Sequence, residues 1–341
     1  MIEEKLNQIY TMKKIDLVKD YRTKHPEMPT AKLARIIYNE NNLLFNSVEN
    51  VRTALRTIEG KNGIQKRNEL KNKYSEFYRE NRPSNPYNLP NSDETIYHPF
   101  IIKGYKKVGI LSDIHLPYHN LDALTEALTY LKENKVDAVL LNGDTIDCHQ
   151  LSNYLKDPKK RDFKYELDSL KRFFEILDTV LKCKIFFKIG NHEARYEHFL
   201  MQKAGELIGV EEFEFSNIIK AREKGIDVIT SNQYMKLNDL NGLHGHEYKG
   251  GISAPVNIAR GLYLRGKVSA FQGHNHQTSE HTECDMDGKI TTTWSIGCLS
   301  ELNPAYMPLN KWNHGFAMVE LDENGKDYKF HNKRIFKGKI L

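Results

Sequence analysis

With 341 residues, 39% of them hydrophobic, the chain is long enough to form one large domain and a smaller one. No apolar stretch approaches the roughly 20 residues that cross a bilayer, and the four cysteines form no CxxC pair, which argues against a membrane protein and against a disulfide framework. The net charge of +5 comes from the N-terminus: residues 1–75 hold 15 Lys and Arg against 9 Asp and Glu, a surplus of 6, so the other 266 residues sum to −1. We expect a cytoplasmic protein in solution, and its oligomeric state stays open.

Apolar residues recur at helical spacing in three runs near the N-terminus, over about 6–21, 31–38 and 48–58. Pro29 and Thr30 mark the start of the second run, and Asn46 with Glu49 has the spacing of a capping box before the third. Gly60 is a stop signal after it. Three short helices suit a helix-turn-helix unit, so we predict a small all-α domain of this kind over residues 1–73.

The third predicted helix has two unlike faces. Its apolar residues share one face, while Arg52, Thr53 and Arg56 fall on the other. If this domain binds DNA, these three side chains are the ones that a recognition helix would present to the major groove. Lys61, Lys66 and Arg67 would then lie near phosphates. The alternative is a solvated helical appendage or a protein-interaction module, and the sequence does not choose between the two.

Residues 74–103 are rich in Pro, Asn and Ser and predict a linker or extended arm before a larger domain over 104–341. That domain begins with strands over 107–112, 138–141 and 184–189, which alternate with helices over 121–133 and 165–181. After about residue 226 the pattern changes to short strands over 234–237, at 243, and over 268–272, 291–296 and 316–321, with one helix near 256–264. We expect an α/β fold in which these later strands form a second sheet packed on the first.

Five polar clusters follow the predicted strands, at the ends where open α/β sheets bind ligands. Their carboxylate, amide and imidazole groups, several next to a glycine that allows a tight turn, offer a mixed nitrogen and oxygen ligand set that suits Mn, Fe or Zn better than Mg or Ca. Two neighbouring ions need a bridging carboxylate, and Asp144 is the natural bridge. The clusters are Asp113 with His115; Gly143, Asp144 and Asp147; Gly190, Asn191, His192 and Glu193; His244 with His246; and Gly273, His274 and His276.

In chain order these clusters spell DxH, GDxxD, GNHE, HG and GHxH, and the series resembles the calcineurin-like metallophosphoesterase superfamily from about residue 106 to the C-terminus. The resemblance implies two packed mixed sheets flanked by helices, a four-layer α/β/β/α sandwich. It also implies two divalent metal ions, with Mn expected and Fe, Zn or Ni as alternatives. One ion would be held by Asp113, His115, Asp144 and His276, and the other by Asp144, Asn191, His244 and His274.

The same resemblance implies that His192 is not a ligand but faces the leaving group of the substrate, with Asp147 as the residue that orients it. A hydroxide shared by the two metals would attack phosphorus in line with the leaving oxygen, and His192 would protonate that oxygen or stabilise its charge. Arg195, one helical turn later, could contact a non-bridging phosphate oxygen. His246 lies two residues from a ligand and has no assigned role.

The substrate is the least defined part of the prediction. The front module resembles the arrangement of phage-type phosphoesterases with an N-terminal helix-turn-helix, and it favours a phosphodiesterase or nuclease acting on DNA or RNA. A phosphomonoesterase acting on a small molecule or a protein, or a cyclic-nucleotide phosphodiesterase, is the alternative. A DNA-binding regulator with a non-catalytic phosphoesterase domain is a second alternative.

Overall fold

The computed structural model describes residues 14–26, 28–59, 88–90, 97–153, 162–248 and 256–341. The chain divides into two compact units, Met1–Glu94 and Thr95–Leu341, and each is described by itself. Among these residues no helix combines the length and the apolar character that crossing a membrane requires. The stop signal at Gly60 and the basic residues Lys61, Lys66 and Arg67 lie outside the described residues, as does most of the predicted linker.

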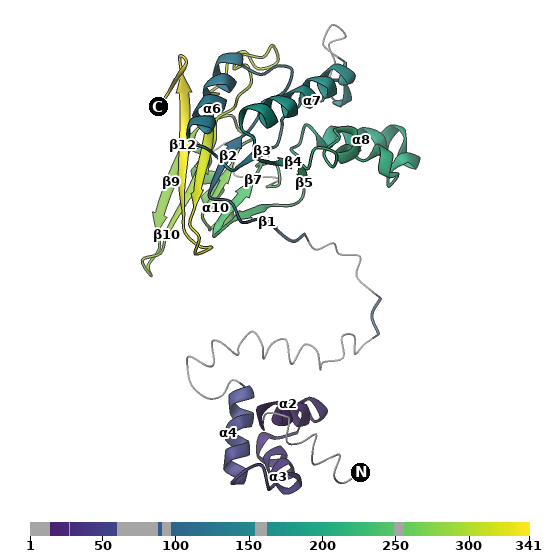
Figure 1. Cartoon of the computed structure of the whole chain (residues 1–341), viewed down its shortest axis with the longest axis vertical. Helices are drawn as coiled ribbons and strands as arrows, with labels where there is room; N and C mark the ends of the chain where they lie inside the picture. The colour runs from purple at the N-terminus through teal and green to yellow at the C-terminus, as the bar shows by residue number, and fades with distance from the viewer. Residues whose placement is uncertain (1–13, 27, 60–87, 91–96, 154–161, 249–255) are drawn as a thin grey trace. The chain divides into compact units, whose positions relative to one another are not determined.

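The N-terminal unit consists of helices α2 (Lys14–Lys24), α3 (Thr30–Glu40) and α4 (Val48–Ile58), as shown in Figure 1. Apolar side chains from all three, including Val18, Ile37 and Leu55, are fully buried in one common core. The first helix ends at Lys24, beyond the predicted run over 6–21, and the part of that run before Lys14 lies outside the described residues. The predicted cap on Asn46 was wrong by one residue, since the Ser47 side chain accepts the Asn50 N–H at 3.2 Å.

A buried ion pair ties the ends of the three helices together. Arg22, near the end of α2, donates from Nη2 to Glu59 Oε1 at 2.6 Å and from Nη1 to the Met28 carbonyl at 2.6 Å. Glu59, which follows α4, also accepts from Thr30 Oγ1 at the start of α3. Both partners are almost completely shielded from solvent. A carboxylate in this position depends on its partner, because an unpaired buried charge costs several kcal/mol.

We therefore expect Arg22→Met to loosen the helical unit by about 3–5 kcal/mol, since Glu59 would stay buried without its cation. Amide hydrogen exchange read by mass spectrometry should show much faster exchange in α2, α3 and α4, and none of this change in residues 97–341. The matched control is Lys24→Met, which removes an exposed lysine from the pair with Asp20 and should leave exchange nearly unchanged. Equal protection in Arg22→Met and wild type would show that the pair does not hold the unit together.

The larger unit contains a seven-stranded sheet in the order β13-β12-β11-β2-β3-β4-β5. Strands β2 to β5 are parallel, while β11, β12 and β13 extend the sheet in antiparallel fashion. The bounds are β2 (Lys107–Leu111), β3 (Ala138–Asn142), β4 (Lys184–Lys188), β5 (Asp227–Ile229), β11 (His314–Leu321), β12 (Tyr328–Phe336) and β13 (Lys339–Ile340). The prediction that the strand over 316–321 belongs to the second sheet was wrong, because β11 pairs with β2.

The second sheet has six strands in the order β1-β6-β7-β8-β10-β9. Its strands are β1 (Phe100–Ile102), β6 (Met235–Leu237), β7 (Leu240–Leu243), β8 (Ala270–Gln272), β9 (Ser279–Cys284) and β10 (Ile290–Ser295). The linker predicted over 74–103 is too long at its C-terminal end, because β1 pairs in parallel with β6. The sheet is built from segments before and after the parallel strands of the first one.

Helices cover the outer faces of both sheets, so the unit is the four-layer α/β/β/α sandwich. Residues of α6 (Leu121–Glu133) and α7 (Phe163–Val180) pack on one face of the seven-stranded sheet, and both helices are seen at the top of the unit in Figure 1. The other face of that sheet packs against the six-stranded sheet, with Ile110, Leu140 and Phe271 in the shared core. Leu262 of α10 (Ile258–Gly266) packs on the far side of the second sheet. Along β2, Val108 and Ile110 face the core between the sheets and Leu111 faces the helices, as the strand period of two requires.

The remaining helical segments lie between β4 and β5 or next to β3. They are the α-helices α8 (Ala194–Lys203) and α9 (Phe215–Ile218) and the 3₁₀ turns η1 (His149–Leu151), η2 (Gly205–Leu207) and η3 (Glu211–Phe213).

Candidate metal centre

The seven predicted ligands follow five strands and meet where the carboxyl ends of the two sheets come together. Asp113 and His115 come after β2, Asp144 after β3 and Asn191 after β4. His244 follows β7, and His274 and His276 follow β8, both from the second sheet. The centre is therefore shared between the sheets, and neither sheet can form it alone.

Asp113, His115 and His276 form one cluster. His276 Nε2 lies 3.2 Å from Asp113 Oδ1 and 3.3 Å from His115 Nε2. One ligand atom from each residue falls within 4.8 Å of the others. Asp144 adjoins this cluster, with its Oδ2 at 3.9 Å from His115 Nε2. These are the residues that the resemblance placed on the first ion.

Asp144, His244 and His274 form a second cluster by the same criterion. His244 Nε2 lies 3.2 Å from Asp144 Oδ2 and 3.1 Å from Asn191 Oδ1. The other nitrogen of this ring, Nδ1, lies 2.7 Å from the Asn142 carbonyl and so donates to it, which fixes the ring with Nε2 toward the cluster. Asp144 also forms a group with His115 and His192 by this criterion, so it lies between the two sets of predicted ligands, as a bridging carboxylate would.

The backbone at these residues is strained in a consistent way. Asp113, His115, Asp144, His274 and His276 all have φ between 51° and 64°, a region that residues other than glycine seldom occupy. Such positions cost free energy and concentrate at functional sites. A sharp turn directly after each strand is what aims these side chains back over the sheet edge.

Two glycines allow the turns to approach one another. A Cβ on Gly190 would overlap the Asp144 carboxylate, and a Cβ on Gly273 would overlap Ser112 and the Asp113 carboxylate. Any larger residue at either position would push a predicted ligand out of place. The glycines of GNHE and GHxH are thus explained by the lack of space for a Cβ, since neither has a positive φ.

The electrostatics of the clusters suit cations. Burial opposes a charge on His244, but Asp144 outweighs burial and raises the pKa of His244 to about 10. Burial likewise opposes a charge on His276, while Asp113 raises the pKa of His276 to about 10. Without a metal, protons on these two rings balance the buried carboxylates; a divalent ion would displace them, so binding should release protons. The donor set fits metal ions.

A family profile described as calcineurin-like phosphoesterase matches residues 106–286 of this chain. The chain belongs to the calcineurin-like phosphoesterase family. It is therefore a metal-dependent phosphoric ester hydrolase that uses divalent ions, and the sandwich fold predicted from the resemblance is confirmed. None of the curated proteins matches the chain.

Solved structures with a similar fold are distant in sequence. Vacuolar protein sorting 29 from Cryptosporidium parvum has 12% identity and a TM-score of 0.38, with 70% of this chain and 96% of that chain covered. A dimetal phosphatase from Danio rerio has 13% identity and a TM-score of 0.33, with 67% and 96% covered. The phosphoesterase YfcE from E. coli has 15% identity and a TM-score of 0.32, with 66% and 98% covered. Structural similarity this distant is no basis for assigning a function to this phosphoesterase.

Asp147 lies between two histidines of the phosphoesterase centre. Its Oδ1 is 3.0 Å from His115 Nδ1 and 3.1 Å from His192 Nδ1. Asp147 thus contacts the ring it was predicted to orient and also a predicted ligand, which sequence reasoning did not foresee. His149, which no motif includes, is close on the other side, with Nδ1 at 3.7 Å from Asp147 Oδ2.

His192 and Arg195 form one polar group beside the first cluster. The His192 ring meets the His115 ring edge to face, with centroids 4.4 Å apart. Arg195 donates from Nη1 to the Asp147 carbonyl at 2.8 Å, and its Nη2 lies 3.0 Å from His192 Nε2. His246, to which no role was assigned, is half-buried near the second cluster, with its ring centroid 5.3 Å from that of His244.

Glu193 is a functional residue that sequence reasoning left without a role. Its carboxylate is buried and accepts four backbone N–H groups: Oε2 from Asp144 at 3.0 Å and Gly190 at 2.9 Å, and Oε1 from Thr145 at 2.6 Å and Ile146 at 3.1 Å. These bonds clamp the loop after β3 to the loop after β4. The sequence signal for this role was the glutamate that ends GNHE, because the resemblance does not assign this acidic residue to either metal ion.

Lys188 and Glu247 form an ion pair that contacts the loop carrying His244 of the second cluster. Lys188, fully buried at the end of β4, contacts Glu247 Oε1 at 3.1 Å and donates to the carbonyls of Thr230 and Ser231. Glu247 in turn accepts the N–H of His244 at 3.1 Å, and also that of the following glycine. The signal for this pair was a lysine in the otherwise apolar end of a buried strand.

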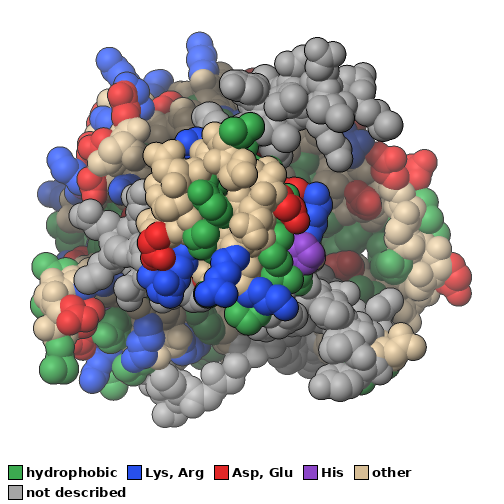
Figure 2. Space-filling model, turned by 90° about the horizontal axis from the view of Figure 1, so that it is seen from below, with side chains coloured by type: hydrophobic (Ala, Val, Ile, Leu, Met, Phe, Trp, Pro, Cys, Tyr) green, Lys and Arg blue, Asp and Glu red, His purple; other side chains and the backbone are tan. Residues whose placement is uncertain are grey.

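The three predicted DNA-contacting residues lie on the side of α4 away from its core. Arg52 and Arg56 are half-buried and Thr53 is exposed, while Val51, Leu55 and Ile58 on the opposite side are buried. Arg52 is engaged by Glu49, with Nη1 and Oε2 3.3 Å apart. Figure 2 shows Lys and Arg side chains interspersed with Asp and Glu on the face that it presents.

We expect Glu193→Gln to destabilise the phosphoesterase unit by roughly 2–5 kcal/mol, because an amide NH₂ would face two N–H donors and leave both without an acceptor. Both tryptophans of the chain, Trp294 and Trp312, belong to this unit, so tryptophan fluorescence during urea denaturation in EDTA follows it alone. Glu197→Gln, an exposed residue on the same helix, is the matched control. Equal unfolding midpoints for Glu193→Gln and the control would contradict the clamp.

Glu166 makes the stability of this unit depend on pH. Burial raises the pKa of Glu166 to about 8, from 4.5 for a free side chain, with a further contribution from Asp147. The folded protein then holds a proton that the unfolded chain releases, so the free energy of unfolding falls as pH rises from about 4.5 to 8. Glu166→Gln should flatten this decline, which amounts to at most about 1.4 kcal/mol per pH unit.

The measurement is urea denaturation of wild type and Glu166→Gln in EDTA at pH 5.5, 7 and 8. Glu175→Gln, at an exposed position of the same helix, should keep the wild-type slope. Parallel stability curves for wild type and Glu166→Gln would show that Glu166 does not titrate in this range.

Proposed function

We propose that this phosphoesterase is a phosphodiesterase or nuclease that cleaves DNA or RNA, with Mn²⁺ as the preferred metal. The observation that carries the choice of a diester is a pocket of about 390 Å³ that starts at Asn191 in the second cluster and is also lined by Tyr97, His198, Asn232 and His246. His192 and Arg195 lie against the first cluster. A diester carries organic groups on two ester oxygens, and these two places can each receive one.

The predicted ligands Asp113, His115, Asp144, Asn191, His244, His274 and His276 would hold the ions. When bound, divalent ions in such a site acidify water and neutralise charge on the phosphoryl oxygens. Mn²⁺ suits the mixed set of imidazole, carboxylate and amide donors, and Fe, Zn or Ni would fit the same set.

We propose that His192 assists the leaving oxygen. Its Nδ1 donates to Asp147 and its Nε2 accepts from Arg195, so Nε2 is the atom that can carry and give a proton once a phosphate oxygen separates it from the guanidinium. Arg195 Nη2 lies next to His192 Nε2. A phosphate oxygen that enters between these two nitrogens would receive a hydrogen bond from each of them. We infer that His192 donates the proton, that Asp147 orients it, and that Arg195 neutralises charge on a non-bridging oxygen.

We expect His192→Ala to lower kcat by about 10²–10⁴ on diesters with an alkoxide leaving group, such as dinucleotides. The loss should be smaller on bis-para-nitrophenyl phosphate, because para-nitrophenolate leaves without a proton. Metal content, measured by mass spectrometry of the dialysed protein, should stay at the wild-type value. An equal loss on both substrates would contradict the acid role. Fast hydrolysis of para-nitrophenyl phosphate with no diester cleavage would favour a monoesterase instead.

We propose that the N-terminal unit binds nucleic acid. Its excess of basic over acidic residues supports this, as does the position of Arg52, Thr53 and Arg56 on the side of α4 away from its core. The connection between α3 and α4 runs from Asn41 to Ser47, longer than the three or four residues of most helix-turn-helix turns. We therefore expect this unit to contact the phosphate backbone of the nucleic acid rather than to recognise its bases.

The double variant Arg52→Glu with Arg56→Glu should weaken binding of a labelled 20-base-pair duplex by about tenfold or more at low salt. Fluorescence anisotropy at several salt concentrations should also give a smaller salt slope. Lys19→Glu with Lys24→Glu on α2 makes the same charge change and is the control. If the two double variants bind equally, α4 does not face the nucleic acid.

A further inference from the structure

A second cavity adjoins the pocket at the metal centre. It has a volume of about 470 Å³, and Asn232 and Glu247 line both cavities, so the two are neighbours. The chain itself also links them, because Leu243 lines the second cavity and the next residue, His244, is a predicted ligand. Glu247 does not present a free negative charge to either cavity, because Lys188 pairs with it.

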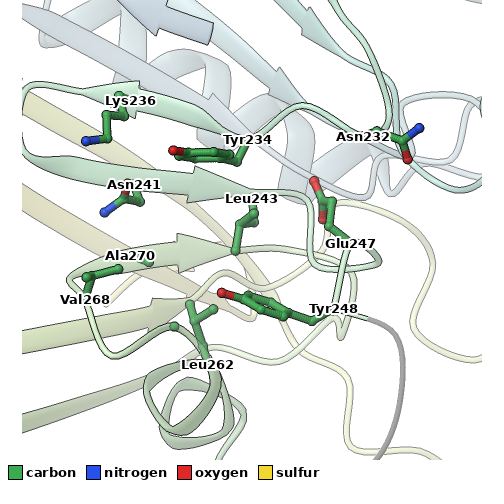
Figure 3. A pocket seen from close by; sticks show the side chains of 11 residues that line it. Asn232, Tyr234, Lys236, Asn241, Leu243, Glu247, Tyr248, Leu262, Val268 and Ala270 are labelled. Atoms are coloured by element: carbon green, nitrogen blue, oxygen red, sulfur yellow. The ribbon is translucent and has the colours of Figure 1, made fainter. Parts of the chain in front are cut away.

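The wall of the second cavity is apolar and aromatic. Tyr234, before β6, and Tyr248, after the His244 loop, both line it, together with Leu243, Leu262 and Val268. Figure 3 shows the Leu243 side chain between the two tyrosine rings, with Glu247 and Asn232 at the side. Surfaces of this kind bind flat apolar groups, and each stacked base contributes about 1–3 kcal/mol in single-stranded nucleic acid complexes.

The rim of the same cavity is basic. The Arg265 guanidinium lies over the Tyr248 ring, 5.2 Å from its centroid, and Lys236 lines the cavity beside Asn241. Rings next to cations match a nucleotide, which carries a planar base beside a negatively charged phosphate.

We propose that the cavity between Tyr234 and Tyr248 binds an unpaired base of a single-stranded DNA or RNA substrate whose scissile phosphate lies at the metal centre. The inference rests on the proposed nuclease function and adds to it the class of substrate. A base in this cavity is flipped out of any duplex, so the enzyme prefers single strands. Substrates too short to reach the cavity bind without the stabilisation that the stacked base provides.

The test compares kcat/KM for single-stranded oligothymidylates of two and eight nucleotides, an eight-base-pair duplex and bis-para-nitrophenyl phosphate. Wild type should cleave the octamer at least about tenfold more efficiently than the dinucleotide, and the duplex more slowly. Tyr248→Ala and Tyr234→Ala should each remove most of the length effect and leave bis-para-nitrophenyl phosphate within about twofold. Phe336→Ala, which removes an exposed ring with Lys337 above it from the other sheet, should change nothing.

Photocrosslinking of an octamer that contains 5-iododeoxyuridine, performed in EDTA, locates the base without any turnover. The expected adduct is on Tyr234 or Tyr248, and it should disappear from the corresponding alanine variant. Adducts found only elsewhere, a length effect unchanged by both variants, or equal cleavage of duplex and single strand would overturn the proposal. Absence of all diester hydrolysis would instead refute the proposed function, and the crosslink would still decide whether the cavity binds a base.

Discussion

The burial of two carboxylates, Asp113 and Asp144, among histidines at the junction of two sheets is the constraint on which the phosphoesterase unit depends. Both side chains are almost inaccessible to solvent, and two like charges so placed require compensation nearby. The protein provides it through the histidines of the second sheet and through backbone N–H groups. The sheets must therefore meet closely and in one register, because the charge and its compensation come from different sheets.

Several unusual features follow from this one requirement. Five residues at positive φ, in the loops after β2, β3 and β8, and glycines without room for a Cβ bring the donors within reach of one another. Behind them, Glu193 clamps two loops through four backbone bonds, and the pair of Lys188 with Glu247 fixes the loop that carries His244. Strain at the centre is thus supported by buried polar groups that are themselves paired, which keeps the site organised before any substrate arrives.

The sequence predicted the parallel strands β2, β3 and β4 well, because strand period is a local signal, and residues of the polar clusters after them lie close together in the structure. It did not predict that β11 joins the first sheet, since pairing with β2 is decided by contacts about 200 residues apart in sequence. β12 was missed because its charged residues hide the alternation of a half-exposed strand. The N-cap of α4 is Ser47 and not the predicted Asn46, a difference within the usual error of helix boundaries. The roles of Glu193 and Lys188 depend on partners more than 40 residues away, which no local pattern shows.

Metal stoichiometry tests most directly whether Asp144 bridges two metal ions. After loading with Mn²⁺ and dialysis, we expect two ions per wild-type chain with a spin-coupled electron paramagnetic resonance signal. Asp144→Asn should lose the coupled signal and at least one ion, while Asp168→Asn at an exposed position should keep both. A single ion per wild-type chain, or a coupled pair that survives Asp144→Asn, would contradict a bridging role for Asp144.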